Sequence, residues 1–192
     1  PTQGDFQWDL LDPVMNQIKS SGLKAEVYLV DSPPFATSAP SGASAPQTYP
    51  PKDPQMYADT LATLAARYPQ VAAWQVWNEP NLPAFWAPDE DPVAYNNLLN
   101  VSMAAVKKVA PNVTVVNGGM AYYSQMPTLN NNLMIYAQGE EGLYSSGAAI
   151  AFHPYSNLPE GDDASSRDFI AFVQIVTGKL RSAKVNQIWA DE

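Results

Sequence analysis

The chain has 192 residues, 46% of them hydrophobic, which is enough for the core of one domain. Its formal charge is −9, and with only ten Lys and Arg residues it has no basic stripe for nucleic acid. No run approaches the roughly 20 apolar residues of a membrane span, and the absence of cysteine excludes disulfides.

Five short apolar runs are predicted to be strands, because each is bounded by turn residues and rich in β-branched or aromatic side chains. Their apolar character is continuous rather than alternating, which is typical of strands buried on both faces of a parallel sheet. In chain order these runs cover residues 24–30, 71–77, 113–116, 148–152 and 185–190.

Helices are predicted between the strands, and their ends are marked. Gly22 is a natural C′ residue for the first helix. At Asp53-Pro54 and Asp91-Pro92, an N-cap acid precedes an N1 proline and starts the next two. A fourth is predicted over 168–180. Residues at helical spacing that we expect to face inward are Leu11, Val14, Met15 and Ile18 in the first, Tyr57, Leu61, Leu64 and Tyr68 in the second, Leu98, Leu99, Val106 and Val109 in the third, and Phe169, Phe172, Val173 and Val176 in the fourth.

Strand–helix alternation with right-handed crossovers leads to a doubly wound sheet or a barrel. The Pro-, Ser- and Ala-rich segment 32–52 is either a linker between two domains or a βα loop that rims a cleft. We favour the loop, because the helix after it continues the βα rhythm. A complete (β/α)8 barrel takes typically about 250 residues, whereas this chain has 192 residues and five predicted strands. The predicted fold is therefore α/β, an incomplete (β/α)8 TIM barrel of about five βα units, with residues 1–192 as one partial catalytic domain.

Two acids end predicted strands. Glu79 follows the apolar run 71–77, and barrel enzymes carry their chemistry at the C-terminal ends of such strands. Glu192 ends a strand that comes three strands later, so both carboxyl groups are expected to face one cleft. Glycosidic-bond hydrolysis requires such a pair of carboxyls. The alternatives are that Glu79 caps the next helix and that Glu192 is a solvated terminal acid.

Three stretches carry a family resemblance: Trp77-Asn-Glu-Pro-Asn-Leu, Ala151-Phe-His-Pro-Tyr-Ser and Ile188-Trp-Ala-Asp-Glu. Together they resemble the retaining glycoside hydrolases of clan A, nearest family 39, which includes xylosidases, iduronidases and exopolysaccharide hydrolases. The resemblance implies that Glu79 is the general acid/base and Glu192 the nucleophile. The further roles that it implies are a hydrogen bond from Asn78 to the sugar 2-hydroxyl, and a cleft-lining pair, His153 and Tyr155, that orients the carboxylates.

The expected activity is hydrolysis of O-glycosidic bonds in an oligo- or polysaccharide, without a cofactor or metal, by a secreted or periplasmic protein. Trp86 either stacks on a sugar ring or covers the barrel rim, and His153 has the alternative of a core histidine. Trp8, Trp74 and Trp189 are expected to be packing residues. Asp162-Asp163 is interpreted as a solvated loop rather than a calcium site. The alternative function is a carbohydrate-binding barrel relic without turnover.

Overall fold

The computed structural model describes residues 2, 4–123, 142–155, 170, 171, 174, 178, 185 and 187–190. Its elements, in chain order, are α1 (Trp8–Ser21), β1 (Glu26–Leu29), the 3-10 turn η1 (Pro46–Thr48), α2 (Pro54–Arg67), β2 (Ala73–Val76), α3 (Pro92–Val109), β3 (Thr114–Asn117), β4 (Met120–Tyr123), the 3-10 turn η2 (Leu143–Ser145), β5 (Ile150–Tyr155) and β6 (Ile188–Ala190). Each of the five predicted strands is present. Of the fourth predicted helix, the described residues 170, 171, 174 and 178 are helical, and its expected inner residues lie outside the described ones.

The strands form two parallel three-stranded sheets, ordered β1-β2-β3 and β4-β5-β6. β3 and β4 follow one another across Gly118 and Gly119, and a parallel bridge between Val116 and Ala149 links β3 to β5 as well. The side chain of Asn117 accepts a hydrogen bond from the Ala151 backbone N–H and so spans the interruption. β3 and β4 therefore act as one interrupted strand, and the β4 half was not predicted.

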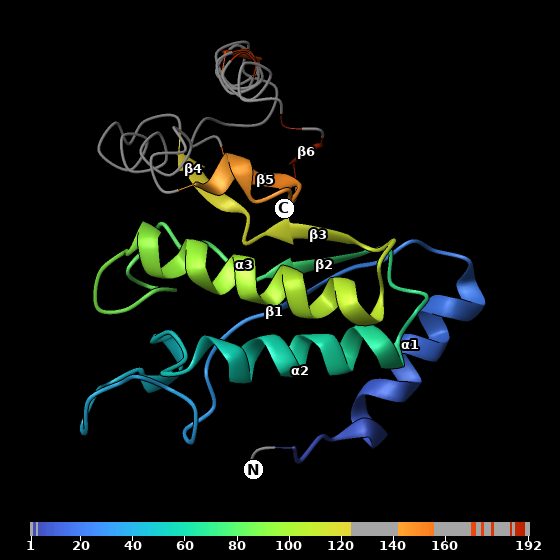
Figure 1. Cartoon of the computed structure of the whole chain (residues 1–192), viewed down its shortest axis with the longest axis horizontal. Coiled ribbons are helices and arrows are strands. Elements are labelled where there is room, and N and C mark those ends of the chain that lie inside the picture. Colours follow the sequence, from blue (N-terminus) through green and yellow to red (C-terminus); the bar gives the residue numbers. More distant parts are fainter. Residues whose placement is uncertain are drawn as a thin grey trace.

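Helices α2 and α3 pack against each other and cover one face of the β1–β3 sheet (Figure 1). Both begin as predicted: Asp53 accepts a hydrogen bond from the Gln55 N–H, and Asp91 accepts one from the Ala94 N–H, each at 2.9 Å. The core between helices and sheet includes Tyr57, Leu61, Leu64, Tyr68, Trp74, Val76, Trp77, Tyr95, Leu98, Leu99 and Val106. Val109 was predicted to face inward, but it is the last residue of α3 and is 48% exposed, so this prediction is wrong.

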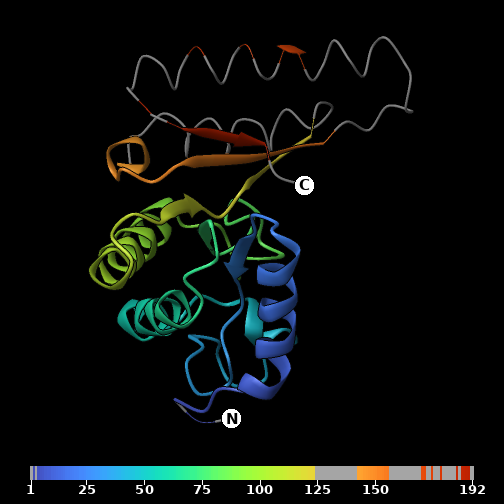
Figure 2. The same cartoon turned by 90° about the vertical axis from the view of Figure 1, so that its right-hand side faces the viewer.

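Helix α1 lies beside this two-layer unit (Figure 2) and ends as predicted at Gly22, which has a left-handed φ of 71°. Its predicted inner face is wrong in part, since Leu11 and Val14 are 37% and 57% exposed. Met15 and Ile18 face the core as predicted, and the stripe that they belong to includes Trp8 and Asp12. Asp12 binds Arg67 and the Tyr68 hydroxyl, so a polar residue occupies a position where hydrophobic spacing predicts an apolar one.

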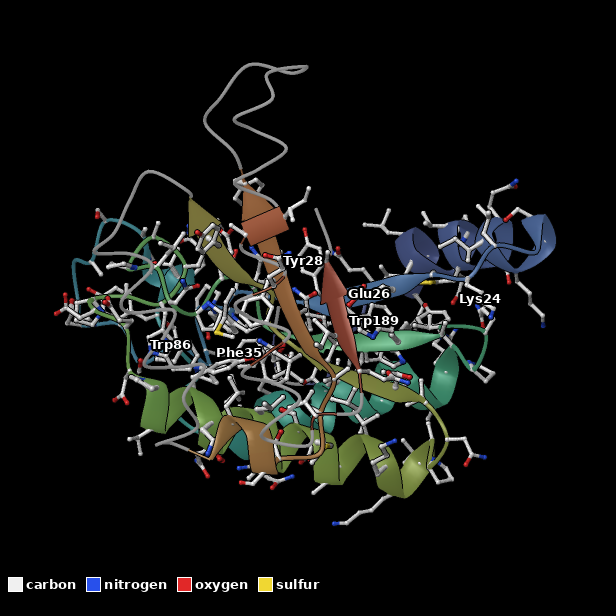
Figure 3. The ribbon with its side chains drawn as sticks, turned by 90° about the horizontal axis from the view of Figure 1, so that it is seen from above. Lys24, Glu26, Tyr28, Phe35, Trp86 and Trp189 are labelled. Atoms are coloured by element: carbon white, nitrogen blue, oxygen red, sulfur yellow. The ribbon has the colours of Figure 1, made fainter. Side chains whose placement is uncertain are left out.

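The sheet face opposite α2 and α3 carries small side chains. Ala73, Val116, Ala149 and Ala151 form a buried cluster there, and Trp189 packs on it. Tyr28 and Glu26 alternate along β1 with the core residues Val27 and Leu29, and Figure 3 shows how Tyr28, Glu26 and Trp189 lie. Trp8, Trp74 and Trp189 are all packing residues, as predicted. Within the described part of the chain, no helix is both long and apolar enough to cross a membrane.

Candidate active site

The backbone turns abruptly where β2 ends. Trp77 and Glu79 both have positive φ angles, 70° and 40°, which are uncommon for residues with a side chain. Each such conformation costs of order 1–3 kcal/mol and persists only where the surrounding structure holds it, most often at functional sites. This turn leaves Glu79 5% exposed at the C-terminal end of a buried parallel strand. The local geometry therefore marks the residue that sequence analysis singled out first.

Glu79 meets His153 across the sheet. Oε1 of Glu79 lies 2.9 Å from Nδ1 of His153, and both side chains are buried. The Tyr155 hydroxyl lies 3.5 Å from the same nitrogen, and the two rings make an edge-to-face contact. His153 and Tyr155 lie on β5, and Glu79 follows β2, so this cluster joins residues from two strands that are not neighbours. A carboxyl and an imidazole in contact can exchange or share a proton, as acid/base chemistry requires.

Asn78 is held by a residue that sequence analysis did not single out. Nε2 of Gln75 donates to Oδ1 of Asn78 at 3.3 Å and to the Trp77 carbonyl at 3.0 Å. The side-chain amide of Asn78 is thus oriented through its oxygen, and its NH₂ group retains the capacity to donate to a hydroxyl. Gln75 is a polar residue within the apolar run 71–77, and this interruption is the sequence signal that could have identified it. In the structure Gln75 is buried, where a polar group needs hydrogen-bond partners.

The loop after Glu79 is fastened to β4. The Glu79 N–H donates to the Gly119 carbonyl at 3.2 Å. The side chain of Asn81 makes a reciprocal pair with Ala121: Nδ2 donates to its carbonyl at 2.9 Å, and Oδ1 accepts from its N–H at 3.0 Å. Asn81 is fully buried. It belongs to the Asn-Glu-Pro-Asn stretch, yet no role was predicted for it, because its partners are backbone atoms 40 positions away.

Trp86 lies in the core in this structure. Its ring makes edge-to-face contacts with Trp77 and Tyr95, at centroid distances of 5.5 and 5.6 Å, and only 2% of the residue is exposed. It is labelled in Figure 3 together with Phe35, which belongs to the loop after β1. The geometry favours the packing role for Trp86 over the alternative of stacking on a sugar ring.

Residues 32–52 connect β1 to α2, as the βα-loop interpretation predicts, and a bridge between Thr37 and Pro51 folds the segment back on itself. A hollow of about 450 Å³ lies between this loop, the start of α2 and the residues before α1. Asp31 lines this hollow, and its backbone has a positive φ of 71°. Partial burial raises the pKa of the Asp31 carboxyl. Neither Glu79 nor His153 lines this hollow.

Several predicted residues lie outside the described ones, namely Glu192, Asp162 and Asp163. β6 pairs with β5 as far as Ala190, two positions before Glu192 in the sequence. Among residues that the structure describes, no group of three His, Cys, Asp or Glu side chains is arranged to hold a metal ion. The described part of the candidate site is thus the Glu79–His153–Tyr155 cluster with Asn78 beside it.

No protein-family model matches the chain. Its structure is similar to a monomeric β-xylosidase from Caulobacter crescentus CB15, with 22% identity and a TM-score of 0.65 over 92% of this chain and 38% of that one. A GH39 enzyme from Xanthomonas axonopodis pv. citri matches with 19% identity and a TM-score of 0.65, over 98% and 40% of the two chains. A GH10 protein from Paenibacillus barcinonensis matches with 16% identity and a TM-score of 0.59, over 100% and 57%.

The chain therefore spans between about two fifths and three fifths of the length of these proteins. At such identities the likeness concerns the fold. It confirms the predicted resemblance to clan A glycoside hydrolases, and the neighbours include family 10 as well as the predicted family 39. The α/β architecture with parallel sheets is one that barrel glycosidases share.

Proposed function

We propose that this chain is the catalytic portion of a retaining glycoside hydrolase that cleaves O-glycosidic bonds in an oligo- or polysaccharide. Its two sheets, joined through β3 and β4, would be about five βα units of a (β/α)8 barrel, and residues 1–192 one partial catalytic domain. The observation that carries the proposal is the buried contact between Glu79 and His153 at the C-terminal ends of β2 and β5. This is the end of a parallel barrel at which catalytic groups gather.

The proposed reaction is a double displacement. The carboxylate of Glu192 attacks the anomeric carbon, the bond from that carbon to the departing oxygen breaks, and Glu79 gives its proton to that oxygen. Glu79 then takes a proton from water, whose oxygen attacks the anomeric carbon and releases the Glu192 carboxylate. Glu79 acts first as an acid and then as a base, so each turnover restores both residues.

The surroundings of Glu79 support this assignment. Because His153 contacts Oε1, the transferred proton is assigned to Oε2, the other oxygen of the carboxyl. His153 is assigned to orient the carboxyl, and Tyr155 to orient His153. The NH₂ of Asn78 is assigned to the sugar 2-hydroxyl, since the Asn78 side-chain oxygen already accepts from Gln75.

The substrate class is proposed from the structural neighbours. Two of them are named as β-xylosidases and one as an endo-β-1,4-xylanase, so β-xylosides are the first glycosides to test. A polysaccharide substrate would place the protein outside the cytoplasm, in a secreted or periplasmic location.

The acid/base role is tested by steady-state kinetics on aryl β-xylosides with good and poor leaving groups, in the full chain and in Glu79→Gln. Loss of the acid should lower kcat/KM by about 100- to 10,000-fold for xylosides with poor leaving groups. For xylosides with good leaving groups kcat/KM, which reports the glycosylation step, should be largely spared. Asp89→Asn, which removes an exposed acid from the same loop, is the matched control and should change neither.

Equal losses of kcat/KM on substrates with good and with poor leaving groups in Glu79→Gln would contradict the acid role. Oligosaccharide binding by the wild-type chain without any released sugar would favour the alternative of a carbohydrate-binding barrel relic.

A further inference from the structure

Helices α2 and α3 begin with the same pattern. The sequences are Asp53-Pro-Gln-Met-Tyr57 and Asp91-Pro-Val-Ala-Tyr95. In both, the aspartate is the N-cap, the proline is the first helical residue and the tyrosine is the fourth. Two successive βα crossovers thus place a tyrosine at the same height over the sheet, and both tyrosines are buried.

The two hydroxyls make similar hydrogen bonds. Tyr57 donates to the Leu29 carbonyl at the end of β1 and accepts from the Trp77 N–H, at 2.9 Å, just after β2; the same N–H also donates directly to the Leu29 carbonyl at 3.0 Å. One strand further along, Tyr95 donates to the Val76 carbonyl at 3.1 Å and accepts from the Gly118 N–H just after β3. Leu29, Val76 and Asn117 lie in register across the three strands, so each phenol bridges neighbouring strands at the level where their ladder ends.

Both bridges meet on one peptide group. Val76 supplies its carbonyl, which accepts from Tyr95, and Trp77 supplies its N–H, which donates to Tyr57. The next residue to turn is Trp77 itself, with its positive φ, and Glu79 follows two positions later. A positive φ at a residue with a side chain is energetically unfavourable, so it persists only where surrounding contacts hold the backbone in place.

We propose that Tyr57 and Tyr95 are positioning residues that clamp the Val76–Trp77 peptide and thereby hold the Glu79 carboxyl against His153. The inference rests on the proposed function for its catalytic consequence, but the clamp itself concerns only the geometry of this chain. The first turns of α2 and α3, which carry the two tyrosines, would thus help to position the carboxyl of Glu79.

The chemistry of the phenols suits a permanent clamp. Burial raises the pKa of both hydroxyls well above the ordinary tyrosine value, so each keeps the proton that it donates across the working pH range. The rings also pack, Tyr57 on Trp77 and Tyr95 on Trp86. A Tyr→Phe change removes the bridging oxygen and retains that packing, which makes it the appropriate probe.

The test uses Tyr57→Phe and Tyr95→Phe in the full chain, with Tyr68→Phe as the matched control. Tyr68 is also buried, but its hydroxyl donates to Asp12 at the other end of α2. His153 is the sole histidine, so its two imidazole ¹⁵N resonances are identified without assignment. In both clamp variants we expect these resonances to move in the direction that they move in Glu79→Gln, and to stay in place in Tyr68→Phe.

A second readout is catalytic. On aryl β-xylosides, each clamp variant should lose about 10- to 100-fold in kcat/KM with poor leaving groups and much less with good ones, because kcat/KM reports the glycosylation step and the misplaced group is the acid of that step. Unmoved histidine resonances together with an unchanged leaving-group dependence, in whichever clamp variant remains folded by circular dichroism, would overturn the clamp. If the wild-type chain hydrolyses nothing and the resonances still move as expected, the proposed function fails and the clamp stands.

Discussion

Nδ1 of His153 lies 2.9 Å from Oε1 of Glu79, although the two residues are 74 positions apart and their strands, β5 and β2, are separated in the sheets by β3 and β4. Both side chains are almost inaccessible to solvent. Polar groups buried in this way are stable only when each satisfies the other. The contact therefore links the fold's stability to the chemistry proposed for Glu79.

A double-mutant cycle with Glu79→Gln and His153→Asn measures this link. Because the two groups touch in a buried site, we expect a coupling free energy of about 1–3 kcal/mol in urea unfolding at neutral pH. The exposed contact between Gln55 and Asp59 is the control, and there the coupling should stay below about 0.5 kcal/mol. Additive effects of Glu79→Gln and His153→Asn would mean that the contact contributes nothing.

Replacing Gly118 should damage the joint between β3 and β4. A Cβ there would lie 2.7 Å from the Val76 carbonyl oxygen and 2.8 Å from the Trp77 carbonyl carbon, both backbone atoms that cannot move aside without shifting β2. We expect Gly118→Ala to lower the free energy of unfolding by about 1–3 kcal/mol. Gly178→Ala is the contrast, since a Cβ at that helical position meets nothing within 4 Å and alanine favours a helix. Equal stability of the two variants would show that the close approach is relieved cheaply.

Asn81 should be required for the loop that carries Glu79. Removing its amide in Asn81→Ala leaves both the N–H and the carbonyl of Ala121 without these partners in a buried place. The expected loss is about 1–3 kcal/mol of unfolding free energy. Asn112→Ala changes an exposed asparagine and should stay within about 0.5 kcal/mol of wild type. Hydrogen exchange at the Ala121 amide should also accelerate in Asn81→Ala alone, and unchanged protection would contradict the assigned contact.

The ion pair between Asp12 and Arg67 should make stability depend on pH. The hydrogen bonds that Arg67 donates to Asp12 lower the pKa of Asp12 below the ordinary value of 3.8 that applies in the unfolded chain. The stabilisation is therefore fully present above that value and is lost as pH falls through the lower folded pKa. Thermal melts should show wild type more stable than Asp12→Asn at pH 6, with the difference shrinking below pH 3.8. A difference that is constant with pH, or that persists in an Arg67→Gln background, would point to another cause.

Local signals in the sequence predicted the fold best. The Asp-Pro helix starts and Gly22 depend on capping that involves only adjacent residues, and each is present in the structure. β4 was missed because Asn117-Gly-Gly has the character of a turn, whereas here the glycines interrupt a strand that then continues. The inner face of α1 was misplaced because Asp12 occupies it, paired with a residue 55 positions away.

For the candidate site, strand-end reasoning and family resemblance led to Glu79, His153 and Tyr155, which the structure brings together. The hydroxyls of Tyr57 and Tyr95 could not be found in this way. Helical spacing assigned Tyr57 to the core, where its ring indeed lies, but the partners of both oxygens are backbone atoms of distant strands, and backbone partners leave no residue signature in a single sequence.

The central claim is that Glu79 and Glu192 act together on one anomeric carbon. It is tested most directly by the distance between their carboxyl groups in a crystal structure of the protein. The double displacement predicts about 5 to 5.5 Å across an open cleft. A separation of about 6.5 to 9.5 Å would indicate an inverting mechanism instead, and carboxyl groups that point away from each other would remove Glu192 as the nucleophile.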